Sequence, residues 1–227
     1  MQQMNRQDGF TRIFSSVLAA TALACVCCAG AAHAQSGKLG AYTGTVNIFG
    51  TETGKQTTVT FRASVKIGIP VESNSKTDTR AEVDDVDKPS ALASILQWDV
   101  AGKNTSADSD GKFTSWTCKL AAPVDVPMNA SGALNVDTRA KTHSMFVALV
   151  STKPVALTCI NSRSGAYKEN GPVSLFFGTS EPDVLPWKEL PYSDAAHLAA
   201  KYKLVPVSQM KGRYGPADLE WDLQLKR

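Results

Sequence analysis

The hydrophobic pattern of this chain predicts β-strands along most of its length. The clearest case is the run from 58 to 69, where apolar and polar residues alternate with a period of two. The apolar members of this run are Val59, Phe61, Ala63, Val65, Ile67 and Ile69. Such alternation places one face of a strand in a core and the other in water. Together with the β-rich stretch from Tyr42 to Phe49 and the Gly-containing turn between them, the run predicts a first hairpin.

Similar but shorter patterns continue along the chain. They predict strands at 80–86, 91–100, 113–120, 132–138 and 173–177. On a regular strand at 91–100, the residues that share the apolar side are Leu92, Leu96, Trp98 and Val100. The polar tracts 101–112 and 162–172 are predicted to be loops, because they are rich in Gly, Asn and Ser.

The segment from His143 to Asn161 contains the two most apolar strands of the pattern. Ser151 to Pro154 separates them, and such residues favour a tight reversal, so the segment predicts a β-hairpin. With Val150 opposite Val155, both faces of this hairpin carry apolar side chains. A hairpin that is apolar on both faces requires other structure to pack on each side. We therefore expect one face, with Cys159, to fill a core between two sheets.

The composition changes after residue 178. Six of the eleven prolines lie from Pro172 onward, which favours an extended segment over long strands. Within it, Ala195 to Lys203 is predicted to be a short helix, with Ser193 as its N-cap. The spacing of four between Leu198 and Tyr202 is typical of one helix face. This segment is expected to wrap over the second face of the central hairpin.

These patterns predict a mainly β protein. Its body, residues 35–178, is expected to be an antiparallel β-sandwich of the Ig-like kind, because many short alternating strands separated by turns are typical of that class. Residues 179–227 are expected to form an extended, Pro-rich C-terminal wrapping segment with one short helix.

The first 34 residues predict a secretory signal peptide. A basic start with Arg6 and Arg12 precedes an apolar run, and small residues lead to a cleavage site after Ala34. Two alternatives remain open: an uncleaved membrane anchor, and a lipoprotein signal ending at Cys25. Cleavage predicts a periplasmic or secreted protein with no transmembrane segment after signal removal.

The charge balance excludes one class of partner. The chain carries 24 basic and 21 acidic residues, a formal net charge of +3, with both signs interspersed. No basic patch of the kind that binds nucleic acid is visible in this pattern. A protein or a cell-envelope component is therefore the expected partner.

The cysteines predict one disulfide. Three of the five lie in the predicted signal peptide, which leaves Cys118 and Cys159 as a pair in an exported protein. On a strand at 113–120, Trp116, Cys118 and Leu120 point inward, as a bridge to Cys159 requires. Free thiols or metal ligands are the alternative, but His143 and His197 are the only histidines available to complete a metal site.

No motif in the sequence predicts a catalytic residue, a metal site or a cofactor. The stretch from Asp108 to Gly111 resembles part of a calcium loop, but Thr117 stands where the bidentate acid is needed, so a polar turn is the better interpretation. Trp98 and Trp116 fall on inward positions. Trp187 and Trp221 lie in the irregular tail, where they are either residues that fasten the tail to the body or part of a contact surface.

These observations favour an exported, non-catalytic binding or cell-envelope structural module. A pilus or adhesin subunit is one form of it, since Gly44 to Gly50 resembles the opening of fimbrial subunits, although the cysteine placement does not support that form. The alternative is a secreted hydrolase with a cleft between the sandwich and the C-terminal segment, in which His143 or His197 would act. A third hypothesis is an inhibitor that inserts the 162–172 loop into another protein.

Overall fold

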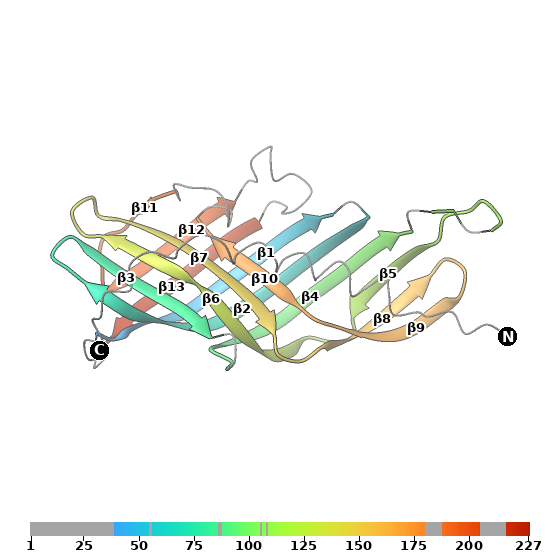
Figure 1. Ribbon diagram of the computed structural model, residues 1–227, viewed down its shortest axis with the longest axis horizontal. Coiled ribbons are helices and arrows are strands. Elements are labelled where there is room, and N and C mark those ends of the chain that lie inside the picture. The colour runs from blue at the N-terminus through green and yellow to red at the C-terminus, as the bar shows by residue number, and fades with distance from the viewer. Residues whose placement is uncertain are drawn as a thin grey trace, which may run out of the picture. The chain divides into compact units, whose positions relative to one another are not determined.

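The computed structural model describes residues 39–54, 56–85, 88–104, 106–107, 109–179, 188–204 and 217–227. This part of the chain contains strands and no helix. The strands are β1 (Ala41–Thr53), β2 (Thr57–Asn74), β3 (Asp78–Asp85), β4 (Ala91–Lys103), β5 (Ser115–Leu120), β6 (Val124–Asp137), β7 (Thr142–Ser151), β8 (Val155–Asn161), β9 (Gly165–Gly171), β10 (Ser174–Gly178), β11 (Leu190–Pro191), β12 (His197–Leu204) and β13 (Ala217–Lys226). They form one thirteen-stranded antiparallel sheet, which confirms the predicted mainly β, antiparallel class (Figure 1).

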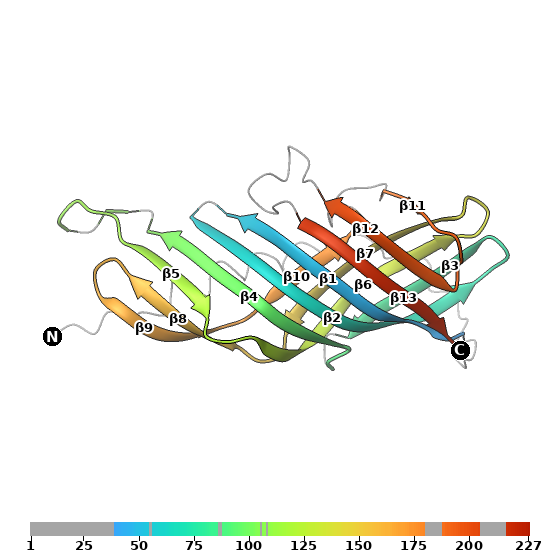
Figure 2. The ribbon, with the colours of Figure 1, turned by 180° about the vertical axis from the view of Figure 1, so that it is seen from behind.

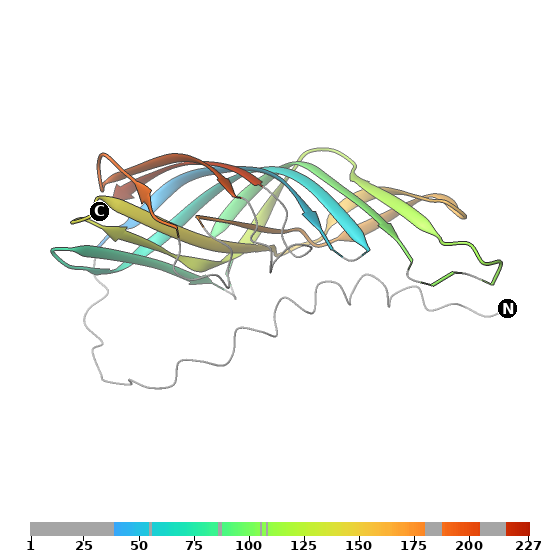
Figure 3. The same ribbon diagram turned by 90° about the horizontal axis from the view of Figure 1, so that it is seen from above.

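Hydrogen bonding connects the strands in the order β12-β13-β1-β2-β3-β6-β4-β5-β8-β9. β7 lies beside β6 and pairs on its other edge with β10 and β11. The sheet folds over itself, so that β12, β13 and β1 lie in one layer above β6 and β7 (Figure 3). At one end, β5, β8 and β9 lie side by side, as Figures 1 and 2 both show. We call these three strands the arm.

Two long strands join the layers because each changes neighbours along its length. Residues 57–67 of β2 pair with β4, whereas residues 71–74 pair with β3. Residues 124–128 of β6 pair with β4, whereas residues 130–137 pair with β3. The apolar side chains that point between the layers form one core, whose largest fully buried members include Trp221, Tyr42, Phe177, Ile48, Met145 and Leu149.

The predicted first hairpin is confirmed. β1 and β2 pair from Ala41 with Pro70 to Thr53 with Thr58. The alternation in β2 predicted its buried face correctly, because Phe61, Ala63, Val65, Ile67 and Ile69 are buried and Val59 is partly buried. One wetted face and one buried face are what a strand at the surface of a layered β protein requires.

The C-terminal residues differ from the prediction. The helix predicted at Ala195–Lys203 is wrong, since β12 (His197–Leu204) occupies these residues and pairs with β13 along its whole length. β13 in turn pairs with β1 from Ala217 to Lys226. The strands β12 and β13 therefore extend the sheet. Tertiary pairing overrode a weak helical preference, since Leu198, Tyr202 and Leu204 also fit a period of two.

The central hairpin predicted at His143–Asn161 is also wrong. Both strands exist, as β7 and β8, but they do not pair with each other. β7 pairs with β6 over ten residue pairs from Met128–Ser151 to Asp137–Thr142, and β8 pairs with β5 and β9. Between β7 and β8 the chain passes from the neighbours of β6 to the arm. In this connection Thr152 N donates a hydrogen bond to Pro127 O.

The prediction that other structure packs on both faces of these two strands is also wrong. β7 buries Met145, Val147 and Leu149, while Val150 is exposed. β8 buries Val155, Leu157 and Cys159, while Ile160 is 59% exposed. An apolar side chain on the wetted face of a strand is common, so apolar content alone did not establish burial.

Two further local predictions are corrected. The predicted loop at 162–172 contains β9, an edge strand whose backbone pairs with β8 although its side chains are polar. The second correction concerns β4. Its Ile95 lies opposite Ala63 of β2 and its Gln97 lies opposite Arg62, so Leu96 between them has no partner in β2. This β-bulge shifts the alternation by one residue. Trp98 and Val100 consequently point into the core, whereas Leu92 and Leu96 are exposed.

Close backbone packing between β6 and β7 requires a glycine at position 132. A Cβ on Gly132 would overlap the carbonyl oxygen of Phe146 and lie 2.7 Å from the Cα of Val147. On Gly68, a Cβ would meet only Thr43 Cγ2, at 3.6 Å.

We expect Gly132→Ala to lower the free energy of unfolding by about 1–3 kcal/mol through overpacking. Gly68→Ala is the matched control and should leave it unchanged or slightly raised. Urea denaturation measures both, and equal losses would contradict this packing account.

Within the described ranges, no helix is long and apolar enough to cross a membrane. The predicted signal peptide at 1–34, Asp108 and Trp187 lie outside the described residues. The signal peptide and the exported location therefore stay predictions.

Candidate functional site

The solvent-facing sides of β12, β13, β1, β2 and β4 form one continuous surface, which we call the outer face. Alternation on β1 turns Tyr42, Val46 and Ile48 into the core, so that Asn47 and Phe49 face outward. The register extends these positions into rows across the strands. One row, for example, contains Lys201, Glu220, Asn47, Ser64 and Ser94.

Cross-strand ion pairs occupy the β12–β13 part of the outer face. Three pairs bring His197 Nε2 to 2.9 Å from Asp222 Oδ1, Lys201 Nζ to 3.2 Å from Glu220 Oε1 and Lys203 Nζ to 4.0 Å from Asp218 Oδ1. All six side chains are exposed, so these pairs add little to stability. Charged side chains on an edge strand such as β12 also discourage edge-to-edge aggregation.

The β1–β2–β4 part of the outer face is more apolar. Phe49 and Leu92 are exposed, and the bulge leaves Leu96 49% exposed. The guanidinium of Arg62 lies over the Phe49 ring, 5.0 Å from its centroid, in a cation–π contact. Sequence reasoning placed Leu92 and Leu96 beside Trp98 on the apolar side, because nothing in the local pattern signals the bulge.

Two open grooves hollow the outer face. The first, with a volume of about 920 Å³, runs between β13, β1, β2, β4 and β6; its walls include Thr43, Thr45, Lys66, Leu92, Pro127 and Asp222. The second, about 580 Å³, lies over β12, β13, β1, β2 and β4; its walls include Phe49, Arg62, Leu96, Tyr202, Asp218 and Glu220. Each groove thus combines ammonium or guanidinium groups, carboxylates and exposed apolar side chains.

The predicted disulfide is present. Cys118 of β5 and Cys159 of β8 lie directly opposite each other and are bonded, and both are buried. Tyr167 Oη and Glu169 Oε2 of β9 each lie 4.0 Å from one of the two sulfur atoms. Burial raises the pKa of Glu169 above its ordinary value. Although the two cysteines and Glu169 are grouped closely enough to hold a metal ion, the sulfurs are bonded to each other and offer no thiolate.

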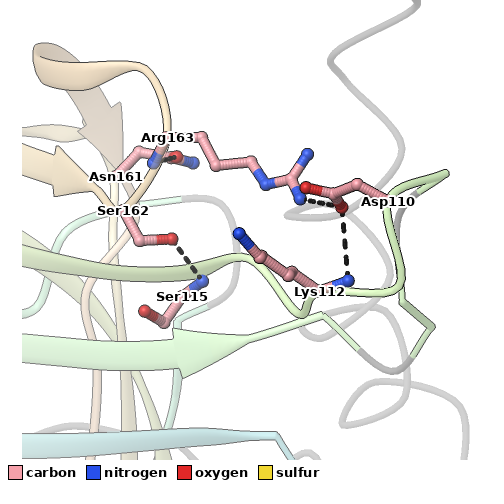
Figure 4. A network of polar contacts seen from close by, with 6 residues as sticks. All are labelled: Asp110, Lys112, Ser115, Asn161, Ser162 and Arg163. Carbon is pink, nitrogen blue, oxygen red and sulfur yellow. Dashed lines mark hydrogen bonds and ion pairs between the residues drawn. The ribbon is translucent and has the colours of Figure 1, made fainter.

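A polar network holds the loop before β5 against the β8–β9 turn (Figure 4). The guanidinium of Arg163 pairs with the carboxylate of Asp110, which also accepts a hydrogen bond from Lys112 N at 3.2 Å. Ser115 N donates to Ser162 Oγ at 3.1 Å. The hydrogen bond from Arg163, followed by that from Lys112, lowers the pKa of Asp110. Its carboxylate therefore binds groups of the chain itself, as the polar-turn interpretation requires.

Trp221 lies in the core, between the two layers. It is 1% exposed, and its Nε1–H donates to His143 Nε2 at 3.2 Å. The two rings meet edge to face, with centroids 5.8 Å apart. Trp221 therefore cannot be the contact surface that the sequence left open for it, because alternation on β13 directs it inward. His143 is enclosed as well, and of the two histidines only His197 lies at the surface.

The chain matches no protein-family model, no curated protein and no solved structure. The geometry of the outer face is thus what supports a functional proposal.

Proposed function

We propose that this protein is an exported, non-catalytic binding or cell-envelope structural module, built on an Ig-like β-sandwich, that engages its partner through the outer face. The signal sequence directs the chain to the periplasm or the exterior, with cleavage near Ala34. The buried disulfide is compatible with such an oxidising location. The partner is a protein or another component of the envelope.

One observation supports this proposal above the others. Exposed apolar side chains of β1 and β4 stand beside charged pairs of β12 and β13, on strands of a single sheet. An apolar centre with a polar rim is the composition of a protein-binding surface. Paired strands hold the backbone of these residues in place, so little backbone entropy is lost on binding.

The matched pair Leu96→Asp and Ile160→Asp tests the surface. Both side chains are exposed and apolar, but Leu96 lies on the outer face and Ile160 on the arm. We expect Leu96→Asp to reduce the amount of partner recovered from the envelope fraction at least about tenfold, since a buried unpaired charge costs more than 1.4 kcal/mol. Ile160→Asp should recover as much as the wild type.

A photo-crosslinker at Asn47 identifies what is recovered, and one at Thr158 of the arm serves as its control. Crosslinks from position 47 alone, lost with Leu96→Asp, support the proposal. Equal recovery with both Asp variants, or crosslinks only from the arm, would refute the outer face as the binding surface.

The secreted hydrolase is the second candidate, and one observation favours it. The grooves run between the C-terminal strands and the rest of the sheet, and His197 forms its ion pair with Asp222, a wall residue of the first groove. A histidine paired with a carboxylate can act as a general base. A panel of ester, peptide and glycoside substrates, assayed with the wild type and with His197→Ala, separates the two classes. Hydrolysis that disappears in His197→Ala would favour the enzyme.

A further inference from the structure

Residues 189–196 form a strap that joins the two layers of the sheet. At one end, Leu190 and Pro191 pair with His143 and Thr142 of β7, and Tyr192 N donates to Lys141 O at 3.1 Å. At the other end, Ala195 O accepts a hydrogen bond of 2.7 Å from the hydroxyl of Tyr42 on β1. Leu225 N of β13 donates to Ala196 O at 2.8 Å. The strap therefore depends on the position of both layers.

Beside the strap, His143 and Trp221 connect the same two layers. His143 is 1% exposed, and its Nε2 accepts the indole N–H of Trp221. A ring nitrogen that accepts carries no proton, so the neutral ring carries its proton on Nδ1. Nδ1 makes no hydrogen bond of normal geometry. The ring of Tyr192 from the strap lies 6.3 Å from the His143 ring, centroid to centroid.

The charged groups around this contact are engaged elsewhere. On β6, Asp137 Oδ1 accepts from the backbone of Arg139 and Ala140. On the strap, Glu189 accepts from Thr142 Oγ1 at 2.9 Å, and Asp194 accepts from Ala196 N at 2.8 Å.

The remaining titratable groups nearby do not supply a partner for an imidazolium either. Tyr42 and Tyr192 donate their hydroxyls to backbone oxygens. Lys141, in the turn before β7, is exposed and a cation, and Glu220 and Asp222 of β13 form ion pairs on the outer face. Among the described residues, no carboxylate hydrogen-bonds to the His143 ring.

We propose that this contact is an acid-sensitive latch: uptake of one proton at Nε2 of His143 breaks its bond to Trp221 and releases the strap. The incoming proton occupies the lone pair that accepts the indole N–H, so two donors then face each other. Burial of the cation adds a desolvation cost, which outweighs the contact with the Leu190 backbone that favours the charged ring. Opening of the strap lets the imidazolium reach water and exposes the edge of β7.

The direction of the pH effect follows from linkage. Burial lowers the pKa of His143 in the closed form below the ordinary value of 6.5, an effect that the backbone of Leu190 partly opposes. In the open form the ring is solvated and titrates near about 6.5. The open form therefore binds the proton more tightly, and closure is strongest above this pH. As the pH falls below about 6.5, the open population should rise about tenfold per unit until the closed form is also protonated.

Hydrogen exchange of the strap amides at pH 7.5, 6.0 and 5.0, corrected for intrinsic exchange rates, measures this opening. In the wild type we expect protection at 189–196 to fall with acid while the β1 and β2 amides stay protected. His143→Gln can accept from Trp221 but cannot titrate, so its strap should lose this pH dependence. The surface variant His197→Gln is the control and should keep it.

Two results would overturn the latch: strap protection that does not change with pH in the wild type, or the same acid response in His143→Gln. Loss of protection throughout the sheet at the same pH would also overturn it, because the opening would then be global. Should His143→Gln fail to fold, NMR of the wild type decides. If the His143 ring titrates near about 6.5 and the Trp221 indole resonance does not shift, the proposal is contradicted. If the ring titrates at a lower pH and the indole resonance shifts over the same pH range, the proposal is supported.

Discussion

A variant with both Cys118 and Cys159 replaced by alanine should lose about 4 kcal/mol of unfolding free energy in the chain-entropy model, for a sequence separation of 41 residues. The bridge restrains the unfolded chain across β6 and β7, which both lie within the closed loop. It also holds β5 to β8 in the arm, whose link to the rest of the sheet is the pairing of β5 with residues 99–103 of β4. Alanine is preferred to serine because both positions are buried and a hydroxyl there would need a partner.

Urea denaturation followed by circular dichroism measures this loss. The control is the double variant Lys119→Ala/Thr158→Ala, which changes the neighbouring cross-strand pair of β5 and β8 on the exposed face. Its cost should stay below about 1 kcal/mol, the range of a single cross-strand pair. A double-alanine variant as stable as this control would show that the bridge contributes little to the fold. Reduction of the disulfide in the wild type should reproduce much of the stability loss of the double-alanine variant. Amide hydrogen exchange should then increase first in the arm.

Replacement of Trp221 by alanine should lower the unfolding free energy by about 3–5 kcal/mol, the usual cost of removing a large aromatic from a core. Trp221 is among the largest fully buried side chains and contacts His143 of the opposite layer. Its removal leaves a cavity between the layers and deprives His143 Nε2 of its donor. Trp221→Phe refills much of the cavity but not the hydrogen bond, so its cost should be smaller, about 1–3 kcal/mol.

The same denaturation experiment at pH 7.5, where His143 is neutral, checks this order. Glu220→Ala changes the adjacent residue of β13, whose side chain is exposed on the outer face, and should cost less than about 1 kcal/mol. If Trp221→Ala costs no more than Glu220→Ala, the contact between the layers does not stabilise the fold. A Trp221→Phe variant as unstable as Trp221→Ala would assign the loss to the hydrogen bond instead of the cavity.

Strand content and strand facing were the properties that local patterns predicted best. The alternation in β2 predicted its buried side correctly, and the inward position of Cys118 on β5 is confirmed together with its bond to Cys159. Both depend on side chains that alternate across a strand and on the chemistry of cysteine, which are properties of neighbouring residues.

The candidate site was hardly predictable. The outer face combines residues of five strands from both ends of the chain, and one of its apolar members, Leu96, is exposed because of a bulge. A bulge is a mismatch between two paired strands, so a pattern read along one strand does not reveal it. The contact of His143 with Trp221 is likewise invisible, because 78 residues separate them in the chain.

The sequence by itself determined that this chain forms antiparallel strands with one buried face, and that two of its cysteines pair. Beyond the β1–β2 hairpin, only the tertiary structure decided which strands are neighbours. β7 and β8 follow each other in the chain but pair elsewhere, and residues 197–204 became a strand because β13 offered an unpaired edge. The physical reason is that backbone hydrogen bonds are alike at every residue, so the choice of partner depends on how the whole set of strands buries its apolar faces together.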